Sequence, residues 1–230
     1  MPTFSKFRDV QAVMDKANNS LPNIERQYLD CLHKEEIPDS LLVDIKDYLA
    51  NLRSALDYLW HKIPNAPNSY FPVANSEADF IAKTKGIDGE RVASLKGCQD
   101  YDPNSWIRAF NLFRNKNAHF TLTPQTRRET KEFSVKTPGS SDPIATFHGC
   151  TFGGNGNCIS VMGTPMPIDL KTQFPVNTPG LDIERKIWVD FIFDHSSISP
   201  EFPQGVSALP FLKASLANVT KIIADIEKNL

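Results

Sequence analysis

The sequence lacks any apolar run long enough to cross a membrane. No stretch approaches the roughly 18 uninterrupted apolar residues that a transmembrane helix needs, so neither a membrane span nor a membrane partner is expected. It also lacks a C-x-x-C pair, because its four cysteines are scattered at Cys31, Cys98, Cys150 and Cys158. Without that spacing, a structural zinc site or a redox dithiol is not expected.

The chain has little net charge and does not begin like a secreted protein. Its 25 Lys and Arg residues nearly balance 27 Asp and Glu residues, so a nucleic-acid contact would need a local basic patch. The first residues have neither the basic start nor the apolar run of a secretory signal, which predicts a cytoplasmic protein with reduced thiols. No Ser-His-Asp order, nucleophile elbow or dinucleotide fingerprint is present.

Apolar residues at helical spacing predict four long helices. The first spans residues 4–36 and includes Pro22; because the apolar phase continues across the proline, we expect one kinked helix, or two nearly collinear ones with Ser20 as the second cap. The second begins after Pro38, the third runs from Trp106 to about residue 120, and the last follows Pro210. Residues 64–104 are rich in proline and glycine and are expected to hold only short helices, near residues 76–83 and 90–95.

Between residues 131 and 194 the pattern changes to short β-rich segments separated by turns, which predicts an antiparallel sheet of some four to six strands. The predicted fold is therefore mainly α: a four-helix up-and-down bundle with an antiparallel β insertion before the last helix, α+β overall. We assign residues 1–230 to a single domain, with the bundle in 1–130 and 205–230 and the insertion in 131–204. A division into domains 1–130 and 131–230 ranks second, because it would leave the groove of the first three helices exposed.

One segment of the third helix carries groups suited to phosphate chemistry. Arg114 and His119 are five residues apart and lie roughly on one side of a helix, so both can reach one phosphate. Together with Asn115 they offer a permanent cation, an amide and a group that exchanges protons near neutral pH. Metal-free cleavage of an RNA phosphodiester requires these groups.

The segment Arg114-Asn-Lys-Asn-Ala-His119 resembles the R-x4-H signature of the HEPN superfamily (higher eukaryotes and prokaryotes nucleotide-binding). Residues 51–59 are similar to a segment of uncharacterised bacterial members, and the resemblance covers the helices, about two-thirds of the chain. It implies a bundle of four or more helices, a homodimer that brings two motifs together, and metal-independent endoribonuclease chemistry without a cofactor. Arg114 would bind the scissile phosphate, His119 would act as acid or base, and Asn115 would orient them.

The same resemblance implies a toxin, phage-defence or stress system of bacteria, with an antitoxin or other protein partner. Cleavage would use the ribose 2′-hydroxyl as nucleophile and leave a 2′,3′-cyclic phosphate. The β insertion departs from the basic family pattern, and its role as substrate gate, interface or regulatory sensor stays open. A second hypothesis is a non-catalytic dimeric interaction module whose β insertion binds a partner or a small ligand.

Local charge is consistent with RNA as a partner. Between residues 106 and 131 there are six basic residues and one acid, a net charge of +5 before His119 is counted, and the candidate RNA-binding residues there are Arg108, Lys116, Arg127 and Arg128. The alternative is a solvated helix end and linker, with Arg114 as a surface cation, His119 favoured by the helix dipole and Asn117 as a capping residue.

Three weaker signals have structural interpretations. Asp57 and His61, four residues apart, could present two metal ligands, with His33 and His119 completing a site, but a surface ion pair of Arg53 with Asp57 is the favoured interpretation and no metal is expected. The glycine-rich residues 153–157 are expected to form a hairpin turn. The tryptophans Trp60, Trp106 and Trp188 are expected in the core.

Overall fold

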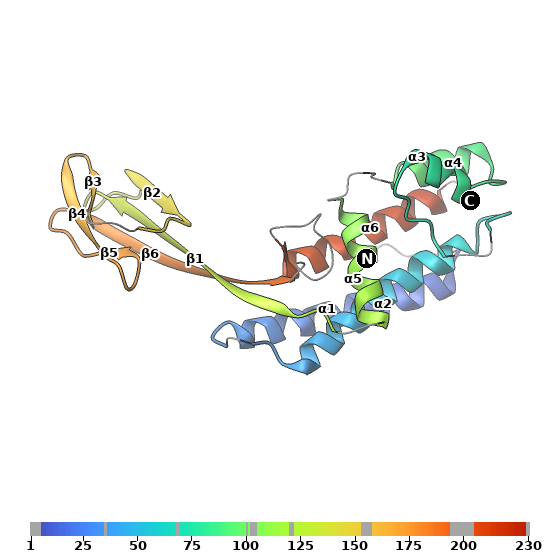
Figure 1. The fold of residues 1–230 in the computed structure, drawn as a ribbon, viewed down its shortest axis with the longest axis horizontal. Coiled ribbons are helices and arrows are strands. Elements are labelled where there is room, and N and C mark those ends of the chain that lie inside the picture. Colours follow the sequence, from blue (N-terminus) through green and yellow to red (C-terminus); the bar gives the residue numbers. More distant parts are fainter. Residues whose placement is uncertain are drawn as a thin grey trace. The chain divides into compact units, whose positions relative to one another are not determined.

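The computed structural model describes residues 6–34, 36–67, 70–99, 101, 105–119, 122–152, 158–193 and 205–228, and of Ser94, Ala118 and His119 it describes the backbone only. Within these ranges the chain has six helices and seven strands, so the predicted α+β class is confirmed (Figure 1). Among the described helices, none combines the length and apolar character that a membrane crossing requires.

Helix α1 (Arg8–Cys31) runs through Pro22 without interruption, so the prediction that the chain continues past the proline is confirmed. Its buried residues are spaced at three, four or seven positions, which keeps them on one face: Val10, Met14, Ala17, Ile24, Tyr28 and Cys31. Ser20 does not begin a second helix. Its hydroxyl instead donates to the carbonyl of Ala17 at 2.9 Å, within the same helix.

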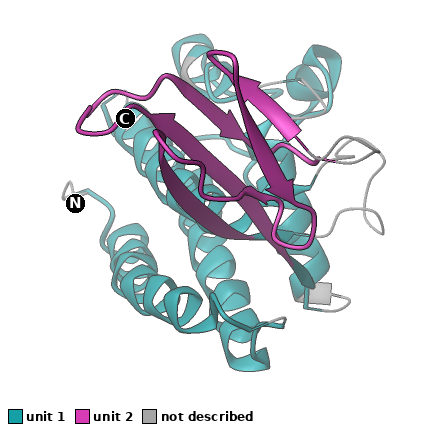
Figure 2. Cartoon of the chain, turned by 90° about the vertical axis from the view of Figure 1, so that its left-hand side faces the viewer, with its two compact units in different colours: residues 1–126, 191–230 teal, residues 127–190 magenta. Residues whose placement is uncertain are grey.

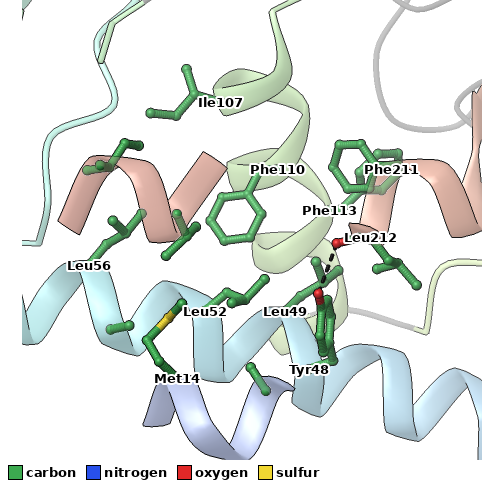
Figure 3. Close-up of a cluster of buried hydrophobic side chains, with 14 of the residues drawn as sticks. Met14, Tyr48, Leu49, Leu52, Leu56, Ile107, Phe110, Phe113, Phe211 and Leu212 are labelled. Atoms are coloured by element: carbon green, nitrogen blue, oxygen red, sulfur yellow. Dashed lines mark hydrogen bonds between the residues drawn. The ribbon is translucent and has the colours of Figure 1, made fainter. Parts of the chain in front are cut away.

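Helix α2 (Asp39–Trp60) lies at the centre of the helical core and contacts α1, α5 (Trp106–His119) and α6 (Ala208–Glu227). Figure 3 shows Leu49 and Leu52 of α2 among Phe110 and Phe113 of α5. The Tyr48 hydroxyl donates to the carbonyl of Leu212 on α6 at 2.9 Å. A helix with neighbours on several sides must be apolar over most of its surface, and α2 has ten buried residues.

The two short helices of the proline-rich region are confirmed as α3 (Glu77–Lys83) and α4 (Gly89–Lys96). Each begins with a side chain that accepts a hydrogen bond from an otherwise unsatisfied backbone N–H. The Ser76 hydroxyl accepts from the Asp79 N–H at 3.2 Å, and Asp88 Oδ1 accepts from the Glu90 N–H at 2.9 Å.

The strands form two antiparallel sheets, where the sequence predicted one. The four-stranded sheet has the order β2-β1-β6-β7 and the three-stranded sheet the order β3-β4-β5. The bounds are β1 (Gln125–Lys136), β2 (Ala145–His148), β3 (Cys158–Val161), β4 (Thr164–Asp169), β5 (Phe174–Pro175), β6 (Asp182–Phe193) and β7 (Val206–Ser207). A two-residue turn of Met162 and Gly163, both with positive φ, joins β3 to β4.

The hairpin turn expected at residues 153–157 lies outside the described part of the chain, but the strands on either side of it are described. Strand β2 precedes them and pairs with β1, where Phe133 faces Phe147. Strand β3 follows them and pairs with β4 in the other sheet. Strands β2 and β3 therefore belong to different sheets, and each pairs with its other neighbour in the sequence.

The chain divides into two compact units, residues 1–126 with 191–230 and residues 127–190 (Figure 2). Unit 1 holds the helices and their core. Unit 2 has a separate small core of Phe133, Val135, Val161, Met166, Ile168 and Phe174. The assignment of the whole chain to one domain stays a prediction.

The three tryptophans do not share one environment. Trp60 is fully buried and Trp106 is half-buried, with its indole N–H donating to the Ser215 hydroxyl at 3.0 Å. Trp188 is 54% exposed, next to Ile187 at 53%, so its predicted core position is wrong. The alternating pattern of β6 predicted a buried face there, but residues 184–188 are exposed on both faces of the strand.

Replacement of Leu52 by Ala is expected to lower the free energy of unfolding by about 2–5 kcal/mol, since the side chain is fully buried where α2 meets α5. The matched control is Leu29→Ala on α1, where the leucine is exposed and the loss should stay within about 0.5 kcal/mol. Urea denaturation followed by circular dichroism measures both. Equal losses would contradict the core assignment.

In unit 2, Trp188→Ala is expected to change the free energy of unfolding by no more than about 0.5 kcal/mol, because the ring is exposed. Phe133→Ala should cost about 3–5 kcal/mol, because that ring is buried and stacked on Phe147 at 4.7 Å. Denaturation monitored by near-ultraviolet circular dichroism compares them. A large loss for Trp188→Ala would show that the ring is packed after all.

Candidate functional site

The residues of the R-x4-H segment lie on the second half of α5. The buried side chains of Phe110 and Phe113 fix this helix in the core, with Phe113 in edge contact with Phe211 at a centroid distance of 5.3 Å (Figure 3). Arg114 follows Phe110 by four residues, so the two share a side of the helix. The core packing of α5 therefore places Arg114 at the border between the core and the surface, where its side chain is half-buried.

Among the described residues, the Arg114 guanidinium is held by its neighbour Asn115 and not by a carboxylate. Its Nη1 donates to Oδ1 of Asn115 at 3.0 Å. Within the described part of the chain, the buried Nε–H of Arg114 has no acceptor and no carboxylate pairs with the side chain. Asn115 thus fixes one end of the Arg114 guanidinium, and its neutral amide does not compensate the positive charge.

Asn117 has a structural contact at the end of the same helix. It is buried, and its Oδ1 accepts from the backbone N–H of Thr123 at 2.7 Å. This hydrogen bond ties the chain that leaves α5 back to the helix. The capping interpretation of Asn117 agrees with this contact.

His119 is the last residue of α5, and its side chain lies outside the described part of the structure. Its place in the site therefore stays a prediction from the spacing of the motif. What the structure describes of the site is the arginine half: Arg114, its partner Asn115, and their surroundings on α2.

Those surroundings include Arg53, which was predicted to lie on the surface of the second helix. Arg53 of α2 is 5% exposed; it lies 3.1 Å from Oδ1 of Asp57 and donates from Nη2 to the carbonyl of Phe71 at 2.8 Å. Asp57 Oδ1 also accepts from the Phe71 N–H at 2.9 Å. The predicted ion pair exists, but its predicted surface position is wrong: it is buried and binds both backbone groups of Phe71.

Arg53 and Arg114 are close enough for their charges to interact. Burial lowers the pKa of Arg53 most strongly, the charge of Asp57 raises that pKa, and the positive charge of Arg114 lowers it again. The sequence contained a signal for the burial of Arg53, because this residue lies four residues after Leu49 and three before Leu56 on the apolar face of α2. An arginine at such a position is buried and needs partners.

Of the other candidate RNA-binding residues, two lie on the same helix as Arg114 and two belong to the other unit. Arg108 and Lys116 lie on α5 and are half-buried. Arg127 and Arg128 belong to unit 2, where Arg127 Nη1 pairs with Glu129 at 2.6 Å and Arg128 lies 3.7 Å from Asp190. The basic stretch is thus divided between the two units.

The alternative interpretation, a metal site, depends first on Asp57 and His61. Asp57 is occupied by Arg53 and by the Phe71 N–H, and His61 is exposed at the end of α2. A search of these residues for three or more His, Cys, Asp or Glu side chains placed around one ion found none.

Comparison of the chain with protein-family models, with curated proteins and with solved structures gave no match. The function is therefore argued from the residues and their geometry alone. Three features carry that argument: an arginine with no acidic partner among the described residues, the asparagine that holds it, and a second, buried arginine whose charge interacts with it.

Replacement of Arg53 by Met is expected to lower the free energy of unfolding by about 3–5 kcal/mol, because the Asp57 carboxylate is left buried without its cation. The double variant Arg53→Met, Asp57→Asn should recover part of that loss. Its amide oxygen still accepts from the Phe71 N–H while the buried charge is gone. Chemical denaturation tests this, and a loss under 1 kcal/mol in the single variant would contradict the buried pair.

Proposed function

We propose that the protein is an RNA-processing protein of the HEPN type, a metal-independent endoribonuclease with its site at Arg114, Asn115 and His119. The mutual contacts of α1, α2, α5 and α6 support a four-helix bundle of that type. The observation that carries the proposal is the half-buried Arg114 guanidinium, which has an amide partner but no carboxylate in the described part of the chain. A cation left in this state favours an anionic ligand.

The proposed reaction needs no metal or cofactor. The ribose 2′-oxygen attacks the neighbouring phosphorus, the bond from phosphorus to the 5′-oxygen breaks, and a 2′,3′-cyclic phosphate forms. One proton leaves the 2′-hydroxyl and one is delivered to the departing 5′-oxygen; His119 carries out one of these transfers. Arg114 neutralises the charge that builds up on the phosphate oxygens, and Asn115 holds the guanidinium in place.

The proposal extends to assembly and setting. A homodimer would bring two such motifs together, so that a second His119 could supply the other proton transfer. The protein would act in the cytoplasm within a toxin, defence or stress system, and an antitoxin or similar partner protein would cover the site. Arg108 and Lys116 on the same helix as Arg114 would contact neighbouring phosphates of the RNA.

Labelled RNAs of mixed sequence, incubated with the protein in EDTA, are expected to yield fragments ending in 2′,3′-cyclic phosphate. Arg114→Ala and His119→Ala should each slow cleavage by about 100-fold or more, because proton transfer and charge neutralisation each contribute at that level. The matched control is Lys46→Ala, which removes one exposed charge from α2 away from these residues. Gel electrophoresis and end-group analysis give the rates.

Cleavage that persists in both variants would contradict the assigned residues. An inert wild type, with folded and equally inert variants, would favour the second candidate, a non-catalytic dimeric module whose β insertion binds a partner or small ligand. Two observations in unit 2 support that candidate: the exposed Ile187–Trp188 pair, and a cavity of about 390 Å³ bordered by Arg128, Lys131 and Gln173 among others.

A further inference from the structure

Two buried guanidinium N–H groups lack acceptors beside the candidate site. Nη1 of Arg53 and Nε of Arg114 are both closed to solvent, and in the described part of the chain neither has a hydrogen-bond partner. A buried donor without an acceptor costs about 1–3 kcal/mol, and more when it is charged. An acceptor that reached either group would therefore remove part of this cost.

Helix positions place both arginines at the same helix–helix contact. Arg53 follows Leu49 by four residues on α2, and Arg114 follows Phe110 by four residues on α5. Figure 3 shows Leu49 and Phe110 in the core where α2 and α5 pack. Since residues four apart share a side of a helix, both arginines lie on the sides of α2 and α5 that take part in this contact, and their charges interact.

The charges at this contact do not balance. Asp57 compensates Arg53, and its Oδ1 already receives the Arg53 and Phe71 donors, so it has little left for a second cation. Arg114 adds a further positive charge and has only the neutral Asn115 as partner. The group of Arg53, Asp57 and Arg114 thus carries one net positive charge in a largely buried place, which an anion would compensate.

A third donor lies on the same side of α5. Asn117 follows Arg114 by three residues and is 8% exposed, and its Nδ2 has no acceptor among the described residues. Its Oδ1 is engaged by the Thr123 N–H, which fixes the orientation of the amide. The unpartnered groups therefore include an amide N–H as well as two guanidinium N–H groups, all of them donors.

We propose that Arg53 and Arg114 bind one and the same phosphate group, with Arg114 on the more exposed side and Arg53 beneath it. Phosphate oxygens accept several hydrogen bonds at once, and the planar guanidinium is the side chain best shaped to donate them. That the phosphate belongs to RNA rests on the proposed function. Arg53 is then a phosphate-binding residue that the R-x4-H spacing does not contain.

The test separates the binding role of Arg53 from its structural role. Arg53→Lys keeps the charge and the reach toward Asp57 but removes the guanidinium fork, whereas Asp57→Asn loosens the same buried pair and leaves the fork intact. Binding of a 2′-O-methylated RNA, which cannot be cleaved, is measured by fluorescence anisotropy on samples shown to be folded. Arg53→Lys and Arg114→Ala should each weaken binding about tenfold, while Asp57→Asn should bind as wild type or more tightly.

Salt dependence shows whether one phosphate is shared. For single strands, log Kobs falls with log salt concentration by about 0.7 per phosphate neutralised, so the slope should drop by about 0.7 in Arg114→Ala and no further when Arg53→Met and Asp57→Asn, which remove the second cation, are combined with it. A second drop of the same size would overturn the shared phosphate. Wild-type binding by Arg53→Lys, with Arg114→Ala weakened, would overturn the role of Arg53 and leave the proposed function standing.

Inorganic phosphate distinguishes failure of the proposed function from failure of this inference. It is titrated into the wild type, Arg53→Lys and Asp57→Asn, with the arginine side-chain nitrogen resonances as the readout. If the wild type binds no RNA but its Arg53 and Arg114 signals shift with phosphate, the anion site stands and the RNA assignment falls. If phosphate moves neither arginine signal and RNA is not bound, the inference is overturned.

Discussion

Burial of helix α2 is the constraint on which the rest of unit 1 depends. The helix contacts α1, α5 and α6, and only one side of it, with Val43, Asp47 and Tyr58, is exposed to water. Nine of its ten buried residues are apolar or aromatic, as such a position demands, and the tenth is Arg53. A charge at that depth is tolerated only with a counter-charge and hydrogen-bond acceptors, and this requirement fixes the conformation of the chain around it.

The effect of that requirement is visible at Phe71. Arg53 donates to the Phe71 carbonyl and Asp57 accepts from the Phe71 N–H, so Phe71 is bound to α2 by both of its backbone groups. Its ring then packs edge-on against Trp60 at 6.3 Å. Since Arg114 approaches the same arginine from α5, the ion pair that stabilises the fold also shapes the electrostatics of the candidate site.

Local periodicity predicted the helices well because a helix of 14 to 24 residues repeats its apolar face several times, even across Pro22. Strand pairing was predicted less well: β2 and β3 belong to different sheets, and β1 lies next to β6, a neighbour distant in the sequence. Alternation in β6 did not reveal that Trp188 is exposed, because a short strand pattern is the same whether or not a second layer covers it. The spacing of Arg53 and Asp57 predicted their ion pair, but i,i+4 spacing carries no information on depth.

The basic stretch shows why a count of charges is a weaker guide to a site than their partners. Arg127 and Arg128 pair with Glu129 and Asp190, and Lys131 donates to the carbonyl of Thr172, so much of the positive charge near residue 130 is already engaged within unit 2. Arg114 differs from them, because its guanidinium has a neutral amide as its partner among the described residues, and its positive charge acts on a second cation, Arg53. Under the proposed function, an anion bound at Arg114 would therefore replace a repulsion between two guanidinium groups by two attractions.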